Sequence, residues 1–139
     1  MKVMMMRKAD AETEKGEMPS EELLQAMADF NEQMLNAGIL VDGTGLMPTS
    51  AGVRVQFSKG EPTVIDGPFT ETKELLAGYT MINVASMEEA IAWAQKWPSM
   101  DSDGNVTLEL RPLYEMEDFA DGAAIEKHKK TGERLARGE

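Results

Sequence analysis

At 139 residues, the chain is long enough for one domain with a substantial hydrophobic core but too short for two independent domains. It carries 14 Lys and Arg against 25 Asp and Glu, and this negative excess argues against nucleic acid or an anionic membrane as the main partner. The absence of cysteine excludes disulfides, thiolate catalysis and zinc–sulfur sites. We therefore expect no metal and no cofactor, and a preference for cationic or neutral ligands.

The N-terminal run 1–7 is too short for the apolar core of a signal peptide, and no later segment is long enough to span a membrane. A cytoplasmic protein is the default expectation. Residues 3–7 form a short apolar run bounded by charge, which favours a buried first strand. Residues 9–19 are polar and acidic, and they predict a mobile loop.

A helix is predicted from Ser20, which can cap it, to Gly38, which can stop it. Its apolar stripe consists of Leu23, Met27, Phe30 and Met34. Ser86 and Glu89 fit a capping box for a second helix, which Pro98 ends.

Strand patterns occupy most of the remaining sequence. A second strand begins at 39–41 and is interrupted by the polar residues 42–45. Residues 53–57 and 63–65 flank a turn and predict a hairpin, and further strands are expected at 78–84 and 106–111. The order of elements matches a ferredoxin-like α+β sandwich, an antiparallel sheet with two helices on one face.

The polar segment 66–74 connects two of these strands, and it reads Asp66-Gly67-Pro68-Phe69 followed by Thr70-Glu71-Thr72-Lys73-Glu74. Without further context this composition is that of an ordinary solvated turn, in which Gly67 takes a positive φ. The whole segment, however, closely resembles the signature of the DGPF-domain branch of the YCII-related family. Its position between a hairpin and a strand fits that resemblance.

The resemblance implies a dimeric α/β barrel, in which a second subunit covers the sheet face that the helices leave open. We therefore expect a homodimer, with burial of that face by the C-terminal segment as the competing arrangement. Residues 1–122 would form the YCII-related (DGPF) domain. Residues 123–139 form a basic C-terminal tail or helix, with five Lys or Arg against three Glu.

The resemblance also bears on function. In the enzyme-like branch of the family an Asp works with a His in proton transfer, and Asp66 matches that aspartate by its place in the motif. No histidine occurs in the predicted first strand, first helix or hairpin, and the single histidine, His128, lies in the basic tail. Relatives in the DGPF branch are often encoded beside alternative sigma factors, which implies a regulatory role.

Two functions remain open. In the first, the protein is a small-molecule-binding or regulatory module that is not an enzyme. Its ligand-binding residues would be Asp66, Phe69, Lys73, Glu74 and Tyr79. In the second, it is a small hydrolase- or lyase-type enzyme in which a buried Asp66 is the catalytic general base.

A last motif, Asp101-Ser102-Asp103-Gly104-Asn105, looks like the start of a calcium loop. The position that should hold glycine is Val106, and Pro112 occupies the position of the closing glutamate. We interpret the segment as a turn.

Overall fold

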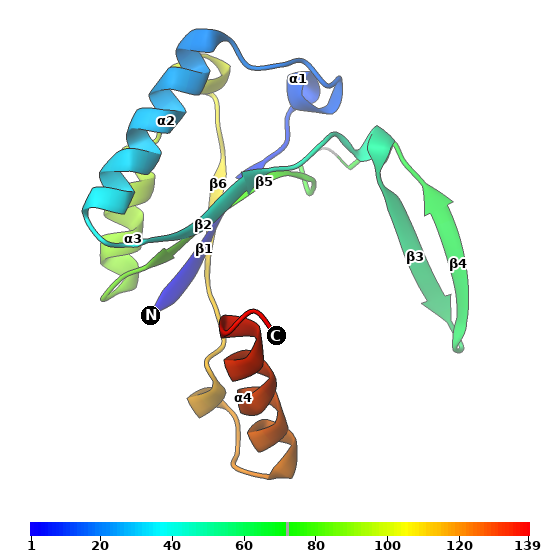
Figure 1. Ribbon diagram of the computed structural model, residues 1–139. Coiled ribbons are helices and arrows are strands. Elements are labelled where there is room, and N and C mark those ends of the chain that lie inside the picture. The colour runs from blue at the N-terminus through cyan, green and yellow to red at the C-terminus, as the bar shows by residue number, and fades with distance from the viewer. Residues whose placement is uncertain (72) are drawn as a thin grey trace.

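The computed structural model describes residues 1–71 and 73–139 and has an α+β architecture (Figure 1). The strands are β1 (Lys2–Lys8), β2 (Leu40–Gly45), β3 (Val53–Ser58), β4 (Glu61–Asp66), β5 (Leu76–Asn83) and β6 (Leu108–Pro112). The α-helices are α1 (Ala11–Glu14), α2 (Glu21–Asn36), α3 (Met87–Ala94) and α4 (Ala123–Ala136). Single 3₁₀ turns form η1 (Thr49–Ala51), η2 (Asp101–Gly104) and η3 (Met116–Asp118).

Four strands form one antiparallel sheet in the order β2-β5-β1-β6, and α2 and α3 cover one of its faces (Figure 1). In chain order the strands of this sheet are β1, β2, β5 and β6. The first and third of them, β1 and β5, are central, as in a ferredoxin-like fold. The predicted α+β class and the placement of both helices on one face are confirmed. We call this sheet with α2 and α3 the body of the molecule.

The core of the body lies between the sheet and the two helices. Its buried apolar residues are Val3, Met5, Phe30, Met34, Ile39, Ile82, Val84 and Ala90. In α2, the hydroxyl of Ser20 accepts a hydrogen bond from the backbone N–H of Leu23, and Gly38 follows the helix with a φ of 75°. The Phe30 ring of α2 packs edge-on against Trp97, with centroids 5.8 Å apart.

The predictions for residues 9–19 and for the second strand differ from the structure. The segment 9–19, predicted as a mobile loop, contains the short helix α1, because the Asp10 side chain accepts from the backbone N–H of Thr13 while the Thr13 hydroxyl accepts from the Asp10 N–H. The second strand does not stop at Asp42. It continues to Gly45, because the polar residues pair with β5 and place their side chains outside the core.

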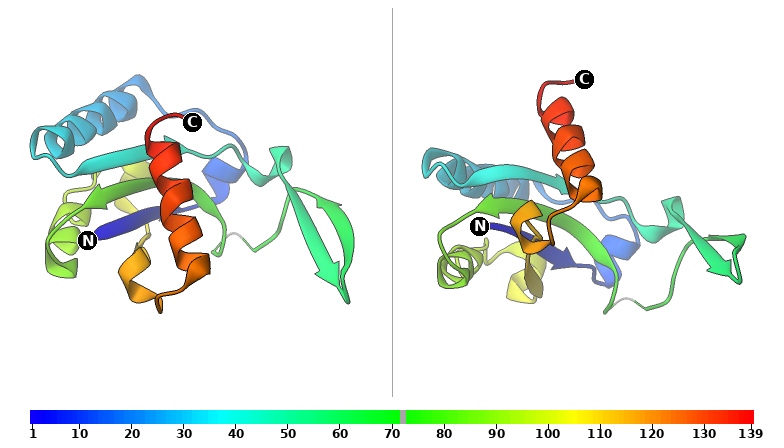
Figure 2. Two further views of the ribbon diagram at one scale, coloured as in Figure 1. Left: turned by 60° about the horizontal axis from the view of Figure 1, so that its bottom comes forward. Right: turned by 90° about the horizontal axis from the view of Figure 1, so that it is seen from below.

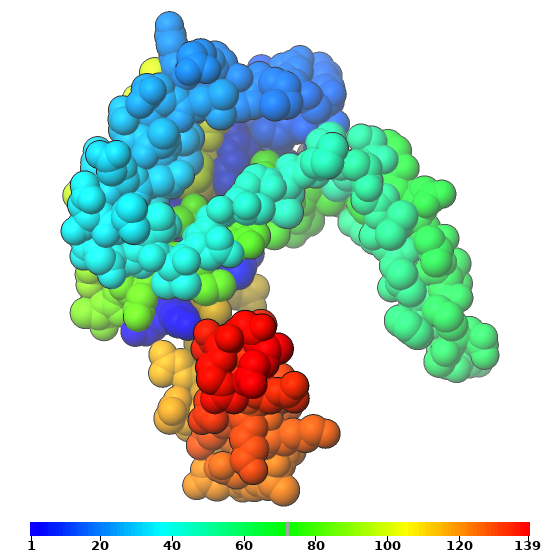
Figure 3. Space-filling view, viewed as in Figure 1, coloured from blue at the N-terminus to red at the C-terminus, as the bar shows by residue number. Residues whose placement is uncertain are grey.

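Two segments project from the body. The hairpin arm, strands β3 and β4, forms a separate two-stranded sheet, and the C-terminal arm consists of η3 and α4. The views of Figure 2 show both arms outside the layers of the body. In the space-filling view of Figure 3 a wide hollow separates the two arms. Within the part of the chain that the structure describes, no helix is both long and apolar enough to cross a membrane.

Candidate functional site

The signature segment forms the root of the hairpin arm. The backbone N–H of Gly67 donates to the carbonyl oxygen of Gly52 (2.9 Å), and that of Phe69 donates to Thr49 Oγ1 (3.0 Å). The Thr49 hydroxyl in turn donates to Glu14 Oε2 (2.6 Å), and the Thr49 N–H donates to Glu14 Oε1 (3.1 Å). The segment therefore ties β4 to η1 and, through Glu14, to α1.

Gly67 is required at this root for a reason other than the predicted one. Its φ is not positive, so the expected left-handed conformation is wrong. A Cβ added at Gly67 would instead overlap the carbonyl oxygen of Thr49, so the two backbones touch where a side chain would stand. The following peptide bond, Gly67–Pro68, is cis.

Phe69 and Glu71 hold an arginine of the hairpin arm. The guanidinium carbon of Arg54 lies 3.8 Å from the centroid of the half-buried Phe69 ring, within the range of a cation–π contact. Arg54 Nη2 is also 3.6 Å from Glu71 Oε2, and both side chains are about half exposed. These contacts set the direction in which the arm leaves the body.

The remaining residues predicted from the motif lie in solvent. Asp66 is exposed at the last position of β4, opposite Val53. Lys73 and Glu74 are exposed in the turn that precedes β5. The predicted burial of Asp66 is therefore absent from the subunit, and a general base would need a partner to exclude water from it.

Tyr79 lies elsewhere, on the sheet face that the helices leave open. Its hydroxyl donates to Asp42 Oδ2 on β2 (3.2 Å). This hydrogen bond and the negative charge of Asp42 raise the pKa of Tyr79. The candidate ligand-binding residues thus occupy two places, the root of the hairpin arm and the open face of the sheet.

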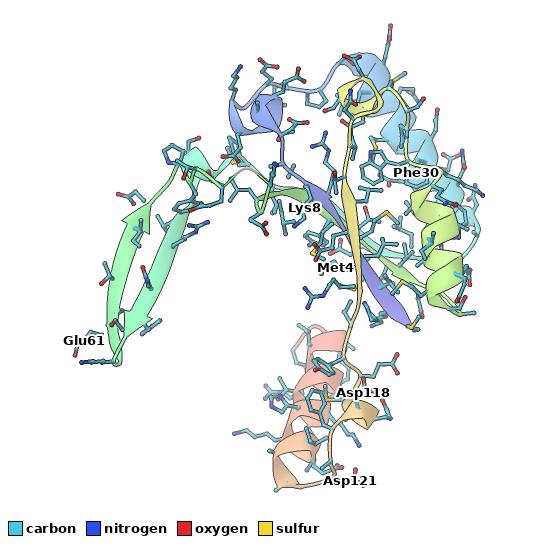
Figure 4. The ribbon with its side chains drawn as sticks, turned by 180° about the vertical axis from the view of Figure 1, so that it is seen from behind. Met4, Lys8, Phe30, Glu61, Asp118 and Asp121 are labelled. Carbon is cyan, nitrogen blue, oxygen red and sulfur yellow. The ribbon has the colours of Figure 1, made fainter. Side chains whose placement is uncertain are left out.

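The open face is apolar at its centre, as expected, but the residues that form this centre were not predicted from the sequence. In β1 the side chains of Val3, Met5 and Arg7 are buried toward the helices, so Met4 and Met6 face the other way and are half-buried. Met4 pairs with Met81 and Met6 with Tyr79 on β5. Figure 4 shows Met4 and Lys8 on the side of the sheet away from Phe30. Because side chains alternate along a strand, the predicted strand at 78–84 could have shown that Tyr79 and Met81 share one face.

Charged side chains surround this centre. On β6, the register places Arg111 opposite Met4 and Glu109 opposite Met6. Lys8 Nζ lies 3.3 Å from Glu109 Oε1, and Asp42 stands on the opposite edge strand. The open face therefore combines three methionines and a tyrosine with a rim that carries both signs of charge.

A buried ion cluster on the other side of the sheet was also missed, since we predicted only a turn at Asp101. Arg7 donates from Nε and Nη2 to Asp101 (3.0 and 2.7 Å) and from Nη2 to Ser102 Oγ (3.0 Å). Trp97 Nε1 donates to Asp101 Oδ2 (2.9 Å), and Asp10 Oδ2 accepts from Ser102 (2.6 Å). Among the described residues no buried side-chain nitrogen or oxygen lacks a partner, so this cluster is a structural clasp.

The clasp perturbs two of its own groups. Burial would lower the pKa of Arg7, but its hydrogen bond and attraction to Asp101 raise that pKa overall. Burial would likewise raise the pKa of Asp10, yet the hydrogen bonds from Ser102 and Thr13 and the charge of Arg7 outweigh it. They hold the pKa of Asp10 at about 2.

His128 lies on α4 and is exposed. Within residues 1–71 and 73–139, no group of three or more His, Cys, Asp or Glu residues is arranged to hold a metal ion. Among the described residues, a shallow groove lies between α2 and Met100 and another lies beside the C-terminal arm. Asp66, Phe69 and Tyr79 line neither of these grooves.

Comparison with known proteins agrees with the signature. A family model described as the YCII-related domain matches residues 1–117. A protein of Rhizobium meliloti (strain 1021), described as uncharacterized, is 34% identical over 93 residues, which cover 67% of this chain and 74% of that protein.

Proposed function

Because the chain belongs to the YCII-related family, we propose that it acts as a cytoplasmic homodimer that binds a small molecule against its paired sheets. One observation carries the proposal, namely the apolar centre of the open sheet face, Met4, Met6, Met81 and Tyr79. A sheet covered on one face only leaves such side chains in water, and a second copy removes them from it.

The rim of the open face supports pairing with an identical face. Lys8 and Arg111 are cationic, and Asp42 and Glu109 are anionic, so a two-fold arrangement can place opposite charges across the interface. Two sheets that pair in this way form the dimeric α/β barrel that the family resemblance implies. The barrel is not closed within one chain.

Methionine suits a ligand-binding wall, because its flexible thioether adapts to irregular apolar surfaces. The Tyr79 hydroxyl and Asp42 supply polar contacts at one edge of this wall. We place the residues of the signature, Asp66, Phe69, Lys73 and Glu74, at the mouth of the same site in the dimer. A regulatory role for ligand binding follows from the DGPF resemblance.

Native mass spectrometry of the purified protein tests this proposal. Wild type should appear as two chains of 15.3 kDa each, carrying extra mass that is retained from purification or taken up from a protein-free extract of the expressing cells. Met81→Glu puts a charge in the centre of the open face and should give single chains without that mass. The control Leu35→Glu, on the exposed side of α2, should behave as wild type.

The outcomes separate the parts of the proposal. A wild-type monomer at micromolar concentration would contradict the dimer. A dimer that neither retains nor takes up a small molecule would contradict the binding function. Turnover that survives removal of residues 123–139 but is lost in Asp66→Asn would replace binding with the enzymatic alternative, because an amide cannot accept a proton.

A further inference from the structure

We propose that the hairpin arm of one subunit docks tip first into the groove beside the C-terminal arm of a second copy. The proposal rests on the homodimer proposed above and adds the contact that holds it. It makes the two arms the two halves of one reciprocal interface, each subunit giving its hairpin and receiving that of its partner.

One face of the hairpin arm is apolar and lies in water. Cross-strand pairing joins Val55 to Val64 and Phe57 to Pro62, and the neighbouring Val53 continues the same face. Phe57 is 68% exposed and Val64 65% exposed. A two-stranded sheet that packs against nothing is marginally stable, so an apolar face of this extent marks a contact surface.

The arm does not fold back on its own subunit in this structure. Its root is held to α1, because the Phe69 N–H donates to Thr49 Oγ1 and the Thr49 hydroxyl donates to Glu14. It points away from the body, and the hollow of Figure 3 lies between it and the C-terminal arm. A second copy that covers the open sheet face must occupy the side of the molecule that both arms flank.

The groove beside the C-terminal arm offers a matching surface. Pro112, Leu113 and Tyr114 are among the residues that line it. Tyr114 is 79% exposed, although the centroid of its ring lies 5.1 Å from that of Phe119. An exposed tyrosine on a fixed aromatic neighbour is a common anchor at protein interfaces, because it buries a large area at a small entropic cost.

The charges at the two surfaces are complementary. The hairpin tip carries Lys59 in the turn that follows Phe57 and Ser58, whereas Glu61 pairs with Ser58 and lies on the face of the hairpin opposite to Phe57. The groove presents Glu115 and Asp118 as anions, and its Arg111 lies 3.6 Å from Glu109 Oε2 on β6. A tip that inserts Phe57 can therefore place Lys59 near Glu115 and Asp118. This pattern favours a second copy over a nucleic acid or an anionic surface.

Disulfide trapping tests the contact cleanly, because the chain has no cysteine of its own. Phe57→Cys and Tyr114→Cys chains, purified separately with different tags, are mixed and oxidised. We expect a mixed-tag disulfide dimer as the main product. Gln56→Cys, on the opposite face of the same hairpin, is the matched control and should form the mixed dimer with Tyr114→Cys at least tenfold less.

A second measurement does not depend on trapping. In sedimentation equilibrium, Phe57→Asp should weaken dimerisation at least tenfold, whereas Gln56→Asp should change it less than threefold. A wild-type dimer that Phe57→Asp leaves unchanged, or that traps positions 57 and 114 no better than the control, would overturn this inference while the proposed dimer stands. A wild-type monomer would overturn both.

Discussion

The body and the arms of this molecule use the same kinds of residue in opposite ways. In the body, Arg7 and Asp101 meet at 2.7 Å with about nine-tenths of each side chain buried. At the root of the hairpin arm, Arg54 and Glu71 approach only to 3.6 Å and are about half exposed. Apolar residues divide likewise, because Ile82 is fully buried whereas Val64 on the hairpin is mostly in water. The body thus buries its apolar and charged side chains, whereas the arms leave theirs largely in water.

The two ion pairs give the sharpest contrast. Asp101→Ala should lower the free energy of unfolding by about 3–5 kcal/mol, because it leaves the buried Arg7 guanidinium without its partner. Glu71→Ala should cost about 0–1 kcal/mol, as for other exposed pairs. Urea unfolding of both variants measures the difference. Equal losses would show that burial does not distinguish the two regions.

Shortening an apolar side chain should likewise lower stability more in the body than in the arms. Ile82→Ala, in the core, should cost about 2–5 kcal/mol through lost burial and a cavity. Val64→Ala, on the hairpin arm, should change the stability of the isolated subunit by less than about 0.5 kcal/mol. Thermal unfolding at low protein concentration is the measurement. A large loss for Val64→Ala under those conditions would place the hairpin within the cooperative unit of the body.

Glycine-to-alanine changes test the junction between body and arm. Gly67→Ala should destabilise by about 1–3 kcal/mol, because its methyl group would overlap the Thr49 carbonyl and force the backbones apart. Gly132→Ala, within α4 and with open space around its Cβ position, should instead be neutral or stabilising by up to about 1 kcal/mol. An unchanged melting temperature in Gly67→Ala would mean that the root of the arm is loose.

The pH dependence of stability, through Asp10 of the clasp, should give the smallest effect. Because the folded-state pKa of Asp10, about 2, lies below its ordinary value of 3.8, the carboxylate stabilises the folded state fully above about pH 4. This contribution is lost as the pH falls toward 2. Thermal unfolding should therefore show wild type more stable than Asp10→Asn near pH 5, with the gap closing toward pH 2. Asp121→Asn, at an exposed position of the C-terminal arm, should show no such closing gap (Figure 4).

The elements with strong local patterns were predicted well. Periodicity and capping predicted the apolar stripe of α2, with Phe30 and Met34 buried, and the hairpin around residues 58–61. They also predicted the order of strands and helices along the chain of the body. The signature segment was also sufficient to identify the family, because nine residues in a fixed context are far more specific than a single turn. Of the candidate ligand-binding residues, Phe69, Lys73 and Glu74 lie in the predicted connection and Tyr79 lies in a predicted strand. Asp66, predicted in that connection, is instead the last residue of β4.

Contacts between residues far apart in the sequence were decided only by the tertiary structure. The clasp joins Arg7 to Asp101 across 94 positions, so no local pattern could reveal it, and the Asp101 segment read alone is a turn. The sequence marks residues 3–7 as apolar but does not say which methionines face the helices. The pairing of β1 with β5 and β6 decides which methionines face the helices, because side chains alternate along β1 and the neighbouring strands fix its register. The need for Gly67 likewise arises from the approach of Thr49, which the chain brings close only when it folds.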